Sequence, residues 1–197
     1  MKWIKIFEDF NTGEITSEER LETKLKEYKI PVDLWGTGSA KTVKHLYNEI
    51  LEEESILEEE SGYLIRYIEF VGIRIYYTDE NGQRWALKED RQEFKDGRVR
   101  RRNMPSSVSE KMKFGENPTL SAVRGIKEEL GIKINSSQLV KRRDLNYDGG
   151  STSYPGLKTR YKGHQYTCNL EKEQFDPKGY IEVQEDKSTF FLWQKVQ

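Results

Sequence analysis

The segment that most constrains this chain is residues 110–132, EKMKFGENPTLSAVRGIKEELGI, because its second half contains a full set of helix signals. Asn117 is a favourable N-cap, and Pro118 suits a first helical position, where the missing N–H is not needed. Gly131 supplies the left-handed residue with which helices commonly end. The sequence therefore predicts a helix over residues 118–130.

The predicted helix has an apolar side and a charged side. Helical spacing gathers the apolar residues on one side: Leu120, Ala122, Val123, Ile126 and Leu130. Arg124, Glu128 and Glu129 lie away from it, and Arg124 can pair with Glu128 across one turn. Adjacent carboxylates at a helix C-terminus oppose the local dipole unless a cation is bound there, and grouped glutamate oxygens suit Mg²⁺.

The segment resembles the Nudix box, G-x5-E-x7-R-E-U-x-E-E-x-G-U, where U is a bulky aliphatic residue. The matching positions are Glu116, Arg124, Ile126, Glu128, Glu129, Gly131 and Ile132. Two positions differ, since Glu110 stands in place of the opening Gly and Gly125 replaces the Glu after the Arg. The resemblance implies an α/β fold, with a Nudix-like mixed β-sheet sandwiched by helices over residues 62–197. Residues 1–61 would form a small α+β N-terminal segment.

The resemblance also implies roles for individual residues. The expected catalytic residues are Arg124, Glu128 and Glu129, and the expected metal ligands are Glu116, Glu128 and Glu129, with Mg²⁺ as the cofactor. The implied activity is Mg²⁺-dependent hydrolysis of a pyrophosphate bond in a nucleoside-diphosphate-linked compound. The alternative is a catalytically impaired Nudix-derived module that binds a nucleotide, another ligand or a protein.

Gly125 needs an explanation, because glycine inside a helix costs about 1 kcal/mol relative to alanine. Either a ligand or a loop packs against the helix there, or selection for the catalytic carboxylate has lapsed. We expect the second, with the base lost or relocated. A relocated acid would come from the 176–187 loop, where Glu182 and Glu185 are the candidates and two solvated acids are the alternative.

Arginines precede the helix in the run RVRRR, residues 98–102. Alternating arginines on a strand beside a phosphate site can grip phosphate oxygens in a fork. Arg98, Arg100 and Arg102 are therefore predicted to bind substrate. The alternative is an exposed strand that balances nearby acids.

Apolar and polar residues alternate in several other stretches, which predicts strands. The expected strands are residues 2–7, 63–77 (with a bulge or break at Gly72), 138–145, 158–170 and 189–196, and residues 147–157 and 176–187 are expected to be loops. A short helix is expected after Thr16, and another after WGTGSAKT with Ser39 as its cap. That stretch lacks both Walker glycines, since Trp35 and Ala40 stand in their places, so we expect no P-loop.

Composition limits the classes of partner. The formal net charge of −1 provides no general attraction to nucleic acid or to an acidic membrane, so neither is an expected partner. A single cysteine, the absence of a signal-peptide pattern and the absence of a membrane-length apolar run predict a cytoplasmic protein. The expected partner is a small nucleotide or diphosphate compound, and a homodimer is left open.

Overall fold

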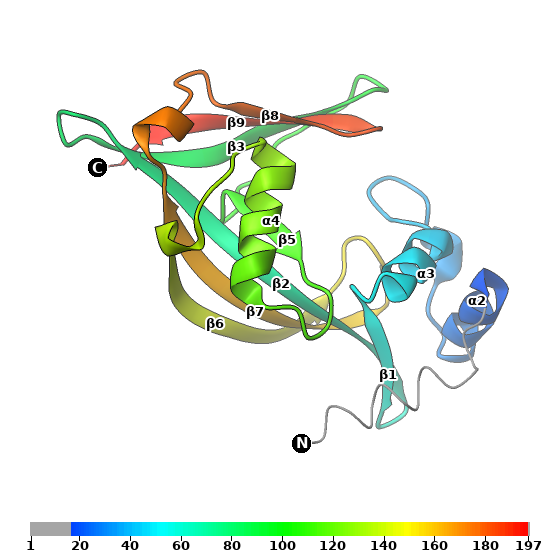
Figure 1. The fold of residues 1–197 in the computed structure, drawn as a ribbon. Helices are drawn as coiled ribbons and strands as arrows, with labels where there is room; N and C mark the ends of the chain where they lie inside the picture. The colour runs from blue at the N-terminus through cyan, green and yellow to red at the C-terminus, as the bar shows by residue number, and fades with distance from the viewer. Residues whose placement is uncertain (1–16, 197) are drawn as a thin grey trace. The chain divides into compact units, whose positions relative to one another are not determined.

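The computed structural model describes residues 17–196, which form two compact units (Figure 1). Unit 1 contains residues 17–69, 113–115 and 146–162, and unit 2 contains residues 70–112, 116–145 and 163–196. The strand predicted at residues 2–7 lies outside the described residues. A domain over residues 62–197 preceded by a smaller segment stays a prediction.

The helices and strands follow one another along the chain in a fixed order. They are α2 (Glu18–Glu27), η1 (Val32–Leu34), α3 (Val43–Leu51), β1 (Ile56–Glu60), β2 (Tyr63–Thr78), β3 (Arg84–Phe94), β4 (Val99–Arg100), β5 (Val108–Lys111), α4 (Pro118–Leu130), η2 (Ser136–Gln138), β6 (Leu139–Gly150), β7 (Lys158–Asn169), η3 (Lys172–Gln174), β8 (Tyr180–Val183) and β9 (Lys187–Lys195). The strands form one sheet in the order β6-β7-β2-β3-β9-β8, with β1 and β5 paired to β2 and β4 paired to β3.

The sheet is mixed. β3 runs antiparallel to β2 and to β9, and β8 runs antiparallel to β9. β2 and β7 run parallel, because contacts between them advance in the same direction along both strands. Gln165 lies against Gly72, and further along the amide of Leu170 donates to the carbonyl of Tyr76 over 2.8 Å. The predicted α/β class, with a large mixed sheet accompanied by helices, is confirmed.

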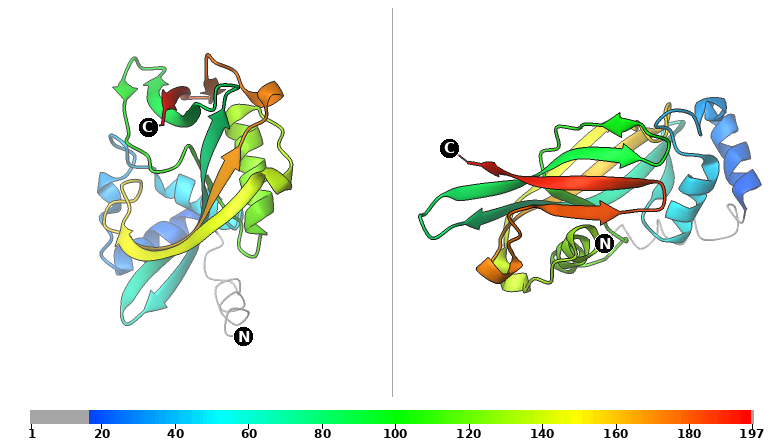
Figure 2. Two further views of the ribbon diagram at one scale, coloured as in Figure 1. Left: turned by 90° about the vertical axis from the view of Figure 1, so that its left-hand side faces the viewer. Right: turned by 90° about the horizontal axis from the view of Figure 1, so that it is seen from above.

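Helix α4 begins and ends where its sequence signals place it. The Asn117 side chain accepts from the amides of Thr119 and Leu120, and Gly131 adopts the left-handed conformation with φ of 70°. Its buried face differs from the predicted one, since Leu120 is 62% exposed while Ser121 and Gly125 are buried. Figure 2 shows α4 against one side of the unit 2 strands.

The core of unit 2 lies between α4 and the strands. Val71, Ile73 and Ile75 of β2 pack there with Ile126 of α4 and with other buried residues, among them Leu87, Val108, Met112, Tyr166, Cys168 and Phe191. The bulge or break predicted at Gly72 is wrong, because β2 continues through it in regular register with β5. A Cβ at position 72 would come within 2.6 Å of the Ser106 hydroxyl and 2.5 Å of the Gln165 amide nitrogen. A side chain at position 72 would therefore displace the ends of the Ser106 and Gln165 side chains.

Unit 1 has a separate core. Its buried residues come from α2, α3, the β1–β2 hairpin and the 146–162 segment, and include Leu21, Leu25, Trp35, Leu46, Leu57, Leu64, Tyr154 and Leu157. Inside this unit, Arg66 and Glu49 form a buried ion pair of 2.5 Å. Two helix caps differ from the predicted ones: Ser17 caps α2 and Thr42 caps α3, each accepting from the amide three residues later.

Several strand boundaries also differ from the predicted ones. β8 lies within the predicted 176–187 loop, β6 extends through Gly150 into the predicted 147–157 loop, and β4 ends at Arg100, so Arg102 follows the strand. A 3₁₀ turn, η1, connects α2 to the segment before α3. Within residues 17–196, no helix combines the length and the apolar character needed to span a bilayer.

Candidate active site

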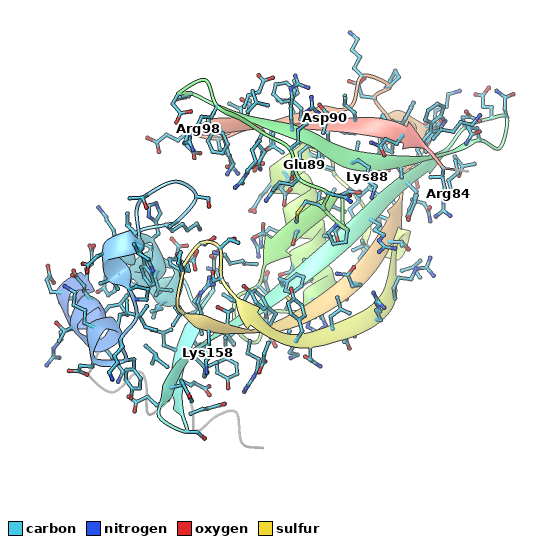
Figure 3. The ribbon with its side chains drawn as sticks, turned by 180° about the vertical axis from the view of Figure 1, so that it is seen from behind. Arg84, Lys88, Glu89, Asp90, Arg98 and Lys158 are labelled. Atoms are coloured by element: carbon cyan, nitrogen blue, oxygen red, sulfur yellow. The ribbon has the colours of Figure 1, made fainter. Side chains whose placement is uncertain are left out.

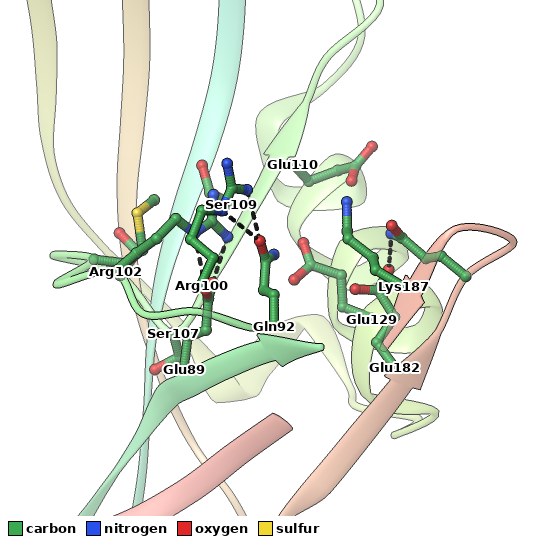
Figure 4. A pocket seen from close by; sticks show the side chains of 13 residues that line it. Glu89, Gln92, Arg100, Arg102, Ser107, Ser109, Glu110, Glu129, Glu182 and Lys187 are labelled. Carbon is green, nitrogen blue, oxygen red and sulfur yellow. Dashed lines mark hydrogen bonds and ion pairs between the residues drawn. The ribbon is translucent and has the colours of Figure 1, made fainter. Parts of the chain in front are cut away.

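A cavity of about 320 Å³ in unit 2 gathers charged side chains from β3, β5, α4 and β8 (Figure 4). It is lined by Glu89, Gln92, Arg100, Arg102, Met104, Ser106, Ser107, Ser109, Glu110, Glu129, Glu182, Gln184 and Lys187. Figure 4 shows the two arginines on one side and Glu129, Glu182 and Lys187 on the other. The cavity therefore offers both cationic and anionic groups to a ligand.

Glu129 is the central acid of this cavity. It lies in the last turn of α4, and burial raises its pKa from an ordinary 4.5 to about 9, with further contributions from the nearby carboxylates of Glu182, Glu110 and Glu89. A hydrogen bond from the Ser109 backbone opposes the shift. A carboxylate in this position takes up either a proton or a cation, because its neighbours repel the bare negative charge.

Two of the other acids are already ion-paired. The side chain of Glu89 is 4% exposed and forms a two-point ion pair with Arg102, whose Nε donates to Oε1 over 2.8 Å. Glu110 accepts from Arg124 over 2.7 Å. Glu182 has a hydrogen bond from Gln184 and no ion pair within residues 17–196. Glu129 and Glu182 are therefore the carboxylates with capacity for a cation.

Arg100 provides one of the positive charges of the cavity. Its guanidinium donates to the side-chain oxygen of Gln92 over 3.0 and 2.6 Å, and it has no ion pair within the described residues. Burial, together with the positive charge of Arg102, lowers the pKa of Arg100 below its ordinary value. An anionic ligand would relieve this repulsion.

The predicted site residues divide into two groups. Glu129, Arg100 and Arg102 line the cavity, whereas Arg98, Glu116, Arg124 and Glu128 are not among its lining residues. Arg98 is ion-paired with Asp96, and Figure 3 shows it at the far end of β3 from Arg84. Glu128 is 57% exposed and forms a 3.3 Å ion pair with Arg124.

Arg124 forms ion pairs with several acids beside the cavity. Beyond Glu128, it pairs with Glu110 and with Glu116 over 3.1 Å, and it donates to the carbonyl of Lys111 over 3.1 Å. Opposite charge on these partners raises the pKa of Arg124 although burial opposes the shift. These contacts therefore tie α4 to β5.

The two departures from the box occupy the same space. A Cβ at Gly125 would lie 2.8 Å from Cβ and 3.1 Å from Cγ of Glu110. Glu110 on β5 thus fills the volume that a side chain at position 125 would need. Of the two explanations for Gly125, the structure shows close packing, and the packing group is a strand side chain, Glu110.

Several lining residues were not predicted from the sequence. Glu89, Gln92, Glu110, Lys187 and the serines at 106, 107 and 109 come from strands or from the segment between β4 and β5. Glu182 was proposed as a loop acid and instead lies on β8. The mismatch at position 110 was the available signal for Glu110, since a charged residue stands where the box has glycine.

Two carboxylates of the cavity could serve as ligands of a divalent cation. Within residues 17–196, no three His, Cys, Asp or Glu side chains converge as a self-sufficient metal site. Mg²⁺ commonly uses only one or two protein carboxylates and takes its remaining ligands from water and substrate phosphates. Glu129 and Glu182 could supply these carboxylates, and their mutual repulsion would fall on binding a cation.

The raised pKa of Glu129 predicts a pH dependence of stability. Between pH 4.5 and about pH 9 the folded chain binds a proton that the unfolded chain has released, so the free energy of unfolding falls as pH rises through this interval. Glu129→Gln removes this loss. In metal-free buffer, we expect the urea midpoint of the variant to match wild type near pH 4.5 and to exceed it at pH 8. Parallel pH curves for the two proteins would contradict the assignment.

Comparison with known proteins gives the following similarities. No protein-family model and no curated protein sequence matches the chain. Among solved structures, an Ap4A hydrolase from C. elegans is 14% identical with a TM-score of 0.38, and the match covers 66% of this chain and 80% of that one. A MutT/nudix family protein from Enterococcus faecalis is 14% identical with a TM-score of 0.44, covering 88% of this chain and 54% of that one.

A third solved structure, the dihydroneopterin triphosphate pyrophosphohydrolase of E. coli, is 18% identical with a TM-score of 0.36. That match covers 65% of this chain and 79% of the other. The chain is thus similar to solved structures of Nudix-type hydrolases, at a level of similarity that does not assign it to their family.

Proposed function

We propose that unit 2 binds a compound with a pyrophosphate linkage in the Glu129 cavity and hydrolyses that linkage with Mg²⁺. The observation that carries the proposal is one cavity with two carboxylates and a guanidinium that form no ion pair within residues 17–196. Glu129 and Glu182 lie on one side of it, and Arg100 lies on the other. A nucleoside-diphosphate-linked compound presents phosphate oxygens that can contact both sides.

Each group of residues has a distinct task in this proposal. Arg100 and Arg102 bind phosphate oxygens, and Gln92 and Glu89 orient their guanidinium groups. Glu129 and Glu182 would hold the metal, which supplies Lewis-acid polarisation of the phosphate and activation of water. Arg124 acts as a positioning residue, because it fixes the strand that carries Glu110 against the helix that carries Glu129.

The test is phosphate release from a panel of dinucleotides and nucleoside diphosphate sugars, with Mg²⁺ and with EDTA. We expect Mg²⁺-dependent release, and we expect Glu129→Gln to lower kcat at least tenfold, because it removes a metal ligand while keeping the shape of the side chain. Glu173→Gln, an exposed change on η3, is the matched control. Unchanged release by the Glu129 variant would refute the assignment.

Glu128 separates the box resemblance from the cavity geometry. By its position in the box it is a metal ligand, whereas its exposed side chain lies outside the cavity lining. If the cavity geometry governs, Glu128→Gln reduces kcat less than Glu129→Gln does. Equal losses in the two variants would favour the role implied by the box.

The second candidate function is ligand binding without turnover. The filling of the space beside Gly125 by Glu110 favours it, since no carboxylate can stand at position 125 in this packing. In that case a diphosphate compound and Mg²⁺ would raise the melting temperature together, with no phosphate release. A cytoplasmic location, a nucleotide partner and a homodimer stay predictions.

A further inference from the structure

A second cavity of unit 2, with a volume of about 360 Å³, is unusually rich in arginine. It is lined by Arg74, Tyr76, Arg84, Arg142, Arg143, Gln165, Tyr166 and Thr167. These residues come from β2, β3, β6 and β7, which are far apart in the sequence. The four arginines are exposed, so the cavity presents their charge to solvent.

Seven other arginines of the described residues have carboxylate partners, whereas these four have none. Ion pairs are formed by Arg66, Arg91, Arg98, Arg101, Arg102, Arg124 and Arg160. Within residues 17–196, none of the four arginines of the second cavity has such a pair. Four positive charges in one small cavity repel one another.

The contacts of these arginines orient their guanidinium groups but use only a few of the N–H donors. Nε of Arg74 donates to the carbonyl of Pro105 over 2.9 Å, and Nε of Arg142 donates to the hydroxyl of Thr167 over 3.0 Å. The Arg84 guanidinium stacks on the Tyr76 ring at 3.8 Å. A guanidinium has five N–H donors, so most of the donors remain available for a ligand.

The nearest acid in sequence does not neutralise the cavity. Asp144 follows Arg143, but its carboxylate is bound by the His164 ring nitrogen over 2.7 Å and by Lys141 over 3.0 Å. These two partners lower the pKa of Asp144, with Lys141 the larger cause. Its charge is thus engaged outside the arginine group.

We propose that the Arg74–Arg84–Arg142–Arg143 cavity binds a run of phosphate groups. Guanidinium groups bind phosphate oxygens in paired hydrogen bonds, and a polyanion would remove the repulsion among the four charges. The phosphates can belong to a free oligophosphate or nucleotide, or to the backbone of a single-stranded nucleic acid. This proposal does not rest on hydrolysis in the Glu129 cavity.

The test measures binding to three probes at low salt: tripolyphosphate, a nucleoside triphosphate and a labelled ten-nucleotide single-stranded RNA. The variant is Arg84→Gln with Arg143→Gln, because neither side chain forms a hydrogen bond or an ion pair within the described residues. The matched control is Arg101→Gln with Lys172→Gln, two exposed cations that are ion-paired with Asp90 and Glu80. Both double variants lower the net charge by two.

We expect the Arg84/Arg143 variant to weaken binding at least tenfold and the control to change it less than twofold. Preference for the RNA probe would identify a nucleic-acid backbone. In that case a plot of log binding constant against log salt concentration should fall with a slope of about −0.7 for each phosphate contact. Preference for tripolyphosphate or the nucleotide would identify a free oligophosphate. Absence of binding to all three probes, or equal loss in both double variants, would overturn the proposal.

Discussion

Replacing Arg66 with methionine is expected to destabilise unit 1 by about 3–5 kcal/mol, because the change leaves the Glu49 carboxylate in the core without its main partner. The Arg66 and Glu49 residues are only 4% and 5% exposed, and Ser55 completes the hydrogen bonding of both side chains. Lys41 keeps a 2.8 Å contact with Glu49, which places the expected loss toward the lower end. Urea unfolding followed by circular dichroism measures it.

Two further variants serve as controls for the expected loss of stability in Arg66→Met. Arg160→Met removes an arginine whose pairs with Glu60 and Asp148 are largely exposed, so it should cost less than about 1 kcal/mol. A double variant with Glu49→Leu and Arg66→Met removes both charges and should recover most of the loss. Equal stability of the Arg66 and Arg160 variants would show that the buried pair contributes little.

Gly125→Glu, the change that would complete the box, is expected to destabilise unit 2 by about 3 kcal/mol. The new Cβ would lie 2.8 Å from Cβ of Glu110, and neither atom can move without shifting the strand or the helix. The added carboxylate would also stand near Glu110 and Glu129, where negative charge already accumulates. Denaturant titration of the single variant tests this expectation.

The same change should be tolerated when Glu110 is replaced by glycine. We expect the double variant to lose at least 2 kcal/mol less stability than the sum of the two single losses, because the clash exists only when both side chains are present. Additive losses would mean that the two positions do not share space. The stability of Gly125→Ala, measured alone and together with Glu110→Gly, separates the steric clash from the added charge. Alanine brings a Cβ and no carboxylate.

Local signals explain which parts of the fold could be predicted. The ends of α4 follow from Asn117, Pro118 and Gly131, which act through their own backbone. β8 could not be predicted in this way, because Tyr180–Val183 is short, half exposed and held by its pairing with β9. The burial of Arg66 on β2 could not be predicted either, because it depends on the pairing with Glu49 of α3.

In the candidate site, too, some residues follow from local sequence signals and others depend on contacts between distant segments. Glu129 could be identified from its position in one helix, and Arg100 and Arg102 from a short basic run. The role of Glu110 depends on how closely β5 approaches Gly125, which no local pattern records. The unpaired arginines at positions 74, 84, 142 and 143 come together only when four strands align.

The interleaving of the two units has a consequence for the order of events at the ribosome. Tyr154 and Leu157 complete the core that contains Leu21, Leu25 and Leu46, although well over a hundred residues separate them from α2. During synthesis, the core formed by α2 and α3 therefore stays incomplete, with apolar side chains exposed to solvent, until Tyr154 and Leu157 have been synthesised and have left the ribosome. During that interval the nascent chain exposes the largest apolar surface to chaperones, and aggregation competes most strongly with folding.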